Sequence, residues 1–192
     1  MRRFCCVGAL AALFCVGIAV ADPVPPRFEI YRVDLVYDED ASASGGQPRR
    51  ARRTNEYATQ EYVAATAVKH ESPVLTEADI IEYCWATQRV QLTAEGARRW
   101  ESLGGYEIGL AGLPVQVFVD GEPQYAALVW NPISSKGCRL PQIWCTTLDN
   151  RLVIGSRYVS AAGDTILGAS YDPQVKQVLG ELGVLIEDCR VK

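Results

Sequence analysis

Side chains able to do acid–base or nucleophilic chemistry are few in this sequence. His70 is the only histidine among the 192 residues, so any Ser-His-Asp or Cys-His arrangement must use it. It lies in Lys69-His70-Glu71 at the end of a predicted strand, and the chain contains no G-x-S-x-G nucleophile motif. We therefore predict a solvent-facing histidine beside charged neighbours and no catalytic residues.

Carboxylates are the other candidates for catalysis, because two that converge could act as acid and base. The central part of the chain contains Glu82, Glu95, Glu101, Glu107, Asp120 and Glu122. Asp120 is explained more simply as a turn former and Glu95 as a charge in the first turn of a helix. An envelope hydrolase that uses convergent carboxylates or His70 remains the alternative to a protein without enzymatic activity. No cofactor is predicted, since the phosphate-binding, dinucleotide-binding and EF-hand motifs are missing.

Four of the seven cysteines, Cys84, Cys138, Cys145 and Cys189, follow the first 21 residues. An even number of cysteines in an exported chain favours two disulfides, and sequence alone permits three pairings. Cys138 and Cys145 bracket a turn that contains proline, which favours a local bridge between them and leaves Cys84 with Cys189. Their spacing lacks the paired C-x2-C pattern of zinc sites, so no metal is predicted.

The N-terminus has the pattern of a cleaved signal peptide over residues 1–21. Arg2 and Arg3 precede an apolar run from Phe4 to Val20, and Ala19-Val20-Ala21 matches the small-x-small cleavage pattern before Asp22. The run has 17 residues, fewer than the roughly 20 that a membrane-spanning helix needs. We therefore expect an exported, periplasmic or secreted protein that is not stably inserted in the membrane.

Cleavage would remove two basic residues and no acidic one, changing the formal net charge from −4 to −6. That charge disfavours nucleic acid as a partner. Residues 22–192 are then expected to form a single domain. Within it, residues 38–56 lack hydrophobic periodicity and are predicted to be a flexible loop. Its cluster Arg49, Arg50, Arg52 and Arg53 could be a docking or processing site, although a solvated loop explains it more simply.

Hydrophobic periodicity, helix caps and turn residues predict the secondary structure. Expected strands are 27–37, with a slip near Tyr31, and 61–69, 83–92, 113–119, 124–130, 142–148, 152–158 and 184–186. Expected helices are 77–81, 94–103 and one that begins after Asp172. Residues 120–123 should form a four-residue hairpin loop, and Asp149-Asn150 a turn. Paired strands with interposed helices predict an α+β domain, with two to three helices on one face of a mainly antiparallel sheet.

The order of motifs between residues 74 and 183 resembles the head subdomain of the first periplasmic domain of SecD, a bacterial export protein. The matching residues are Leu75-Thr76, Asp79-Ile80, Leu92-Thr93, Glu95-Gly96-Ala97, Trp100, Leu103, 117–121 and Ile133-Ser134. The resemblance implies the fold of that head and a role in contacting polypeptide. The membrane helices of SecD are not found here, so its export activity is not expected.

The chain also resembles small exported proteins of unknown role. The shared residues are Tyr83, Trp85, Thr87, Gln88, Tyr125, Trp130, Ser134 and Ser135.

Aromatic residues on neighbouring predicted strands are the best candidates for a binding surface. They are Tyr83, Trp85, Tyr125, Trp130 and Trp144. They could fill the core beneath the helices, or they could stand on an open sheet face and contact a peptide or partner protein. An exposed edge strand at 27–37 could also accept an extended peptide. We therefore expect an exported, non-enzymatic module that binds a protein or peptide in the cell envelope.

Overall fold

The computed structural model describes residues 25–36, 58–135, 138–155, 158–159, 165–166 and 169–189. The predicted signal peptide, the loop at 38–56 and its arginine cluster lie outside these ranges. The strands are β1 Phe28–Leu35, β2 Ala67–Lys69, β3 Leu75–Thr76, β4 Ile80–Cys84, β5 Arg89–Leu92, β6 Leu113–Val119, β7 Glu122–Trp130, β8 Gln142–Trp144, β9 Arg151–Gly155, β10 Tyr158–Val159, β11 Thr165–Ile166 and β12 Leu185–Ile186. The α-helices are α1 Gln60–Thr66, α2 Ala94–Glu101 and α3 Pro173–Glu181, and the 3-10 helices are η3 Glu77–Asp79, η4 Gly105–Glu107 and η5 Ala169–Tyr171.

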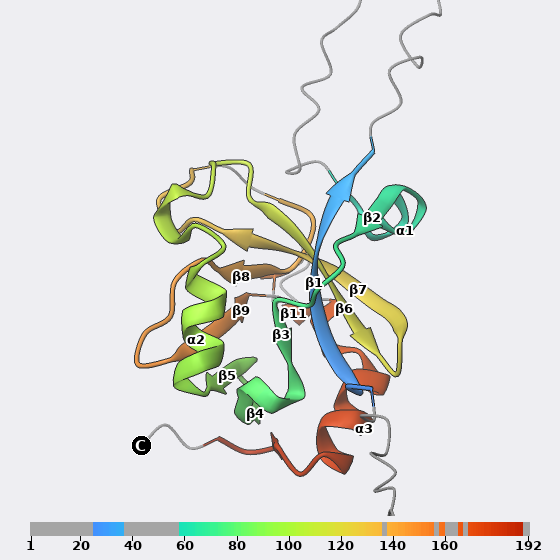
Figure 1. The fold of residues 1–192 in the computed structure, drawn as a ribbon, viewed down its shortest axis with the longest axis vertical. Coiled ribbons are helices and arrows are strands. Elements are labelled where there is room, and N and C mark those ends of the chain that lie inside the picture. Colours follow the sequence, from blue (N-terminus) through green and yellow to red (C-terminus); the bar gives the residue numbers. More distant parts are fainter. Residues whose placement is uncertain are drawn as a thin grey trace, which may run out of the picture.

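Ten of the described strands form one mixed, mostly antiparallel sheet, so the fold is α+β as predicted (Figure 1). The strand order is β12-β4-β5-β9-β8-β7-β6-β1-β2, and β3 also pairs with β1. Only β12 with β4 and β7 with β8 run parallel. The predicted open edge at 27–37 is wrong, because β1 pairs with β6 on one side and with β2 and β3 on the other. The strand is therefore interior and offers no continuous free edge to a peptide.

Two hydrophobic clusters lie on opposite faces of the central strands. In β7, Tyr125, Ala127 and Val129 enter the larger cluster, while the alternate residues Ala126 and Leu128 enter the smaller one. Helices α2 and α3 cover the larger cluster, and α1 covers the smaller one. Two helices thus share a face, and the third lies on the other side.

Strand β1 contributes to both clusters, which explains the predicted slip near Tyr31. Phe28 and Ile30 face the larger cluster, whereas Val33 and Leu35 belong to the smaller one. Figure 1 shows the strand beginning beside α3 and ending near α1 and β2. The side chains that face a core change from even-numbered to odd-numbered residues along β1, because the strand passes from one hydrophobic cluster to the other.

Two of the three predicted helices begin at the predicted side-chain caps, whereas the helix predicted at 77–81 is only the 3-10 helix η3, because the chain enters β4 at Ile80. Thr93 accepts a hydrogen bond from the Gly96 backbone N–H at the start of α2, and Asp172 accepts from the first turn of α3. Gly183, at φ 73°, follows α3. The predicted strand at 61–69 is wrong over most of its length, because Thr59 caps a helix there and only Ala67–Lys69 pairs with β1.

Two turns differ from the predictions. The predicted single strand at 83–92 is instead the β4–β5 hairpin, which turns through residues 85–88. Gln88 adopts a φ of 52° in this turn. Positive φ is uncommon for glutamine, so the sequence did not indicate a turn at this residue. The β6–β7 loop has two residues and not four, because Asp120 and Gly121 both have positive φ and Glu122 already pairs with Val119.

Buried Asp79 joins β3, η3 and α2. Its carboxylate accepts hydrogen bonds from the Thr76 backbone N–H at 2.8 Å and from the Thr76 hydroxyl at 3.3 Å, and it forms an ion pair with Arg99. Its carbonyl accepts from the Thr93 N–H at 2.8 Å. A Cβ on Gly96 would lie 2.8 Å from the Asp79 Cβ, so α2 can approach this closely only with glycine there.

The structure joins Cys84 to Cys189 by a disulfide, as predicted. The predicted Cys138–Cys145 bridge is wrong, since both residues carry free thiols. Strand β8 separates them, and they lie on opposite faces of the sheet. Cys138 packs against the smaller cluster and Cys145 is buried in the larger one. Burial raises the pKa of both thiols, which disfavours their reactive thiolate forms.

Among the described residues, none of the helices has both the length and the apolar character needed to cross a membrane.

Candidate functional site

Most of the five aromatic residues predicted to form a binding surface fill the core. Tyr83, Tyr125 and Trp130 are at most 4% exposed, and they divide between the two clusters. Trp85 is partly buried against the larger cluster. Trp144 alone stands out, with 45% of its surface exposed. These residues therefore do not form one open aromatic platform, because the two faces of the central strands are both covered.

Buried Tyr83 helps to shape the β4–β5 turn. The Tyr83 hydroxyl donates to the buried Gln88 side chain at 2.8 Å, and the Gln88 amide donates to the Trp85 carbonyl at 3.0 Å. Burial, and the neighbouring Tyr125, raise the pKa of Tyr83, and burial likewise raises that of Tyr125. Both phenols stay neutral at physiological pH, which suits a structural role.

His70 and the candidate carboxylates lie in separate surroundings. The His70 Nε2 is 3.0 Å from an Asp34 carboxylate oxygen, and the His70 side chain is 37% exposed. Asp120 makes a two-fold contact with Arg27, which hydrogen-bonds it and holds the pKa of that carboxyl below its usual range. Glu101 accepts a hydrogen bond from the Thr147 hydroxyl at 2.5 Å. Asp120 and Glu101 thus contact different elements, and neither of these two contacts involves His70.

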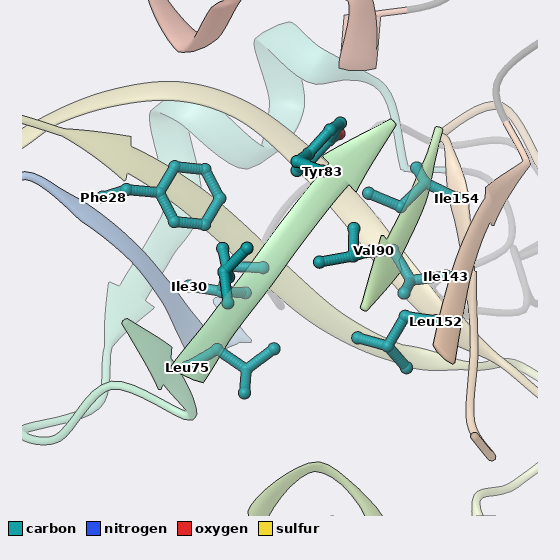
Figure 2. A pocket seen from close by; sticks show the side chains of 9 residues that line it. Phe28, Ile30, Leu75, Tyr83, Val90, Ile143, Leu152 and Ile154 are labelled. Carbon is teal, nitrogen blue, oxygen red and sulfur yellow. The ribbon is translucent and has the colours of Figure 1, made fainter. Parts of the chain in front are cut away.

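An internal cavity of about 10 Å³ lies between β1, β3, β4, β5, β8 and β9, and its lining side chains are drawn in Figure 2. Phe28 and Ile30 of β1 point into it from one side, and Tyr83 and Val90 from the other. The remaining lining residues are Leu75, Ile80, Ile143, Leu152 and Ile154. Such a volume is about the space that one water requires, and an apolar lining keeps a cavity of this kind dry. It is a packing defect of the core and too small for a substrate.

No group of histidine, cysteine, aspartate or glutamate side chains suited to hold a metal ion occurs in the described part of the chain.

Three of the nine exposed large apolar side chains in the described part of the chain lie on two loops that are bonded to each other, which we name the apolar loop pair. The first is residues 104–112, between α2 and β6, and the second is residues 131–135, after β7. Tyr106 is 63% exposed, Leu110 50% and Ile133 73%. Exposed apolar side chains on loops held against each other make this surface a candidate for binding a partner.

Asn131 fixes the two loops to each other. It is only 2% exposed, and its side-chain amide donates to the carbonyls of Tyr106 at 2.9 Å and Ile108 at 3.3 Å. Its side-chain oxygen accepts from the Ile133 N–H at 3.2 Å. The Ser134 hydroxyl adds a bond to the Leu110 carbonyl at 2.9 Å. The backbone beneath all three exposed side chains is thereby held in place.

Gly112 lets the first loop lie against the end of β7. Its φ is 74°, and a Cβ there would be 3.0 Å from the Trp130 ring and 3.2 Å from the Val129 carbonyl oxygen. Trp144 pairs in register with Trp130, the residue before Asn131. The one exposed member of the predicted aromatic set therefore belongs to the strand beside the start of the second loop.

Sequence reasoning missed Tyr106, Leu110 and Ile133. Each has glycine, proline or serine as a neighbour, so none takes part in a strand or helix pattern. The available signal was the presence of large apolar side chains in segments that glycine, or proline and serine, mark as loops.

Comparisons of the chain with protein-family models, with curated proteins and with solved structures gave no match.

Proposed function

We propose that this protein is an exported, non-enzymatic module that binds a protein or peptide in the cell envelope through the apolar loop pair. The observation that carries the proposal is the exposure of Tyr106, Leu110 and Ile133 on loops that the buried Asn131 side chain holds together. Burial of such side chains against a partner removes apolar surface from water, which favours association.

The rigidity of the loops favours recognition. A loop that must be ordered on binding loses conformational entropy, and this lowers affinity. Here Asn131 and Ser134 already satisfy polar backbone groups of both loops, so the apolar side chains are presented on an ordered backbone. Trp144 is half-exposed beside them and could extend the contact, since tryptophan is enriched among the residues that dominate binding energy.

Four features of the sequence and structure support the location and the partner class. The predicted signal peptide at residues 1–21 indicates export, and the Cys84–Cys189 disulfide fits an oxidising compartment. The acidic net charge disfavours nucleic acid. The resemblance to the SecD head suggests a role in contacting polypeptide.

The direct test is site-specific photo-crosslinking in the cells that make the protein. A photoreactive amino acid would replace Ile133 on the loop pair or, as the control, Arg98 on α2, whose side chain is 72% exposed. We expect a discrete protein adduct from position 133 and none of the same mass from position 98. An Asn131→Ala change in the first variant should weaken the adduct, because the loops would lose the bonds that align them.

The proposal is wrong if both positions yield the same adducts, since non-specific collisions would then explain them. It is also wrong if position 133 yields no adduct while the labelled protein is folded and correctly located.

A further inference from the structure

A two-residue strand from the C-terminal part of the chain occupies one edge of the ten-stranded sheet. In β12, Leu185 and Ile186 pair in parallel with Tyr83 and Cys84 of β4. The backbone N–H groups of Tyr83 and Trp85 donate to the carbonyls of residues 184 and 186 at 2.8 and 2.9 Å. Without β12, these donors would lie on an open strand edge, which is a template for another extended segment.

The side chains of this segment show which chemistry the edge recognises. Leu185 packs against the larger cluster, and its Cδ2 would touch a Cβ at Gly180 of α3 at 3.7 Å. Two residues later, Glu187 pairs with Lys176 at 2.9 Å. The Lys176 Nζ also lies 5.6 Å from the centre of the Trp85 ring. The edge of β4 therefore fits an extended segment with an aliphatic residue and, two residues later, an acidic residue.

The disulfide that retains this segment has an asymmetric environment. Cys84 is buried, at 3% exposure, whereas Cys189 is partly exposed. The Thr87 hydroxyl donates a hydrogen bond to the Cys84 sulfur at 2.8 Å. An attacking thiolate would therefore reach Cys189 first and expel Cys84, whose negative charge the Thr87 hydroxyl stabilises. Stabilisation of the leaving thiolate accelerates thiol–disulfide exchange.

We propose that the outer edge of β4 is a second binding site, for an extended aliphatic–acidic segment of a partner protein, which residues 184–187 occupy until the Cys84–Cys189 disulfide is reduced. A dithiol supplies the two electrons: one thiolate attacks the Cys189 sulfur and forms a mixed disulfide, and Cys84 leaves and takes up a proton. The second thiol of the reductant then attacks the mixed disulfide. Cys189 leaves as a thiol, and the reductant ends as a disulfide.

Reduction leaves β12 held by few interactions. Its pairing spans two residues, its ion pair is on the surface, and Leu185 is only partly buried. Two residues, Leu182 and Gly183, connect the end of α3 to residue 184. The short connection keeps the segment nearby, so it continues to compete with a partner. A partner segment can offset that competition by pairing also with the part of β4 that lies before Tyr83 and that β12 does not reach.

The test uses the full chain carrying Cys138→Ser and Cys145→Ser, so that only the Cys84–Cys189 pair responds. The probe is a fluorescent peptide of residues 181–189 carrying Cys189→Ser, which is long enough to pair also with the part of β4 before Tyr83. Its binding is followed by anisotropy with and without dithiothreitol. We expect at least tenfold tighter binding after reduction. A further protein with Cys84→Ser and Cys189→Ser should bind without reductant, and a peptide carrying Glu187→Gln should bind several-fold more weakly.

Two measurements separate the chemistry from the binding site. Thr87→Val alone should slow the reduction of the disulfide several-fold. In a protein that also carries Cys84→Ser and Cys189→Ser, the same change should leave the peptide affinity unchanged. Reduction should also increase hydrogen exchange at the Tyr83 and Trp85 amides. Equal peptide affinity in the oxidised and reduced proteins, or unchanged exchange at those two amides, would overturn the proposal.

Discussion

Replacing Asp79 with alanine should be among the most destabilising single changes in this fold. The carboxylate is buried and satisfies the Thr76 N–H at the start of η3, and it also forms an ion pair with Arg99 of α2. Alanine removes both interactions at once. It would loosen the joint between the β3–η3–β4 segment and the helix that covers the larger cluster.

The expected cost can be worked out from these contacts. A backbone donor left without a partner in a buried site costs about 1–3 kcal/mol. Arg99 is 42% exposed, so it can regain water, and the lost ion pair should cost nearer the ~1 kcal/mol of a surface pair than the value for a buried one. Asp79→Ala should therefore lower the free energy of unfolding by about 2–4 kcal/mol.

Asp79→Asn is the matched variant, because the amide oxygen can still accept from Thr76 while the charge is lost. It should cost roughly 1–2 kcal/mol, less than alanine. Glu95→Ala is the control, since Glu95 is exposed and pairs only with exposed Arg98, and it should change stability by less than about 0.5 kcal/mol. Urea unfolding monitored by tryptophan fluorescence measures all three. A loss below about 1 kcal/mol for Asp79→Ala would refute the assigned role.

Three further outcomes follow from other contacts. Gly96→Ala should destabilise by up to about 2 kcal/mol in the same assay, because the overpacking cost of roughly 1–3 kcal/mol against Asp79 is offset in part by the ~1 kcal/mol that alanine contributes to helix stability; an increase in stability would contradict the close approach. Gln60→Leu should cost about 1–3 kcal/mol, since the Gln60 side chain bonds both the Ala126 N–H and its carbonyl, whereas exposed Gln174→Leu should be nearly neutral. Arg27 lowers the pKa of Asp120, and Gln177 and Arg27 lower the pKa of Glu181. Both ionised carboxylates therefore stabilise the fold at pH values above their unfolded-state pKa, and this contribution is lost as the pH falls through their folded-state pKa values. Arg27→Gln should therefore flatten the loss of stability between about pH 5 and pH 2, and parallel pH profiles for the two proteins would contradict this linkage.

The elements that the sequence predicted correctly are those with local chemical signals. Thr93 and Asp172 cap their helices, and Asp149-Asn150 adopts positive φ at both residues as the turn requires. Hydrophobic alternation located β1 and the β6–β7 hairpin. These signals depend on neighbouring residues only, so tertiary contacts did not have to be known.

The errors occur where contacts distant in sequence decide the conformation. Gln88 turns the chain at positive φ because its buried side chain bonds Tyr83 and Trp85. Helix α1 has the β-branched residues of a strand, yet Val63 packs in the smaller cluster and Gln60 bonds β7. Neither partner can be identified from the local sequence.

The binding surface was misplaced for a related reason. The aromatic residues were grouped because they fall on neighbouring predicted strands, but the sequence could not show that the central strands are covered on both faces. Tyr125 and Trp130 are five residues apart on β7, so they face opposite sides of the sheet and lie in different cores. The apolar loop pair depends on Asn131, whose bonds reach 23 and 25 residues back along the chain.

The measurement that tests the proposed function most directly is the affinity of the full chain for the protein crosslinked at position 133. Ile133→Asp should weaken that binding at least tenfold, because a central apolar contact is commonly worth more than about 1.4 kcal/mol. Arg98→Asp, an equally exposed change away from the loops, should alter it less than twofold. Equal effects of the two substitutions, or none from Ile133→Asp, would contradict the assignment of the apolar loop pair as the contact surface.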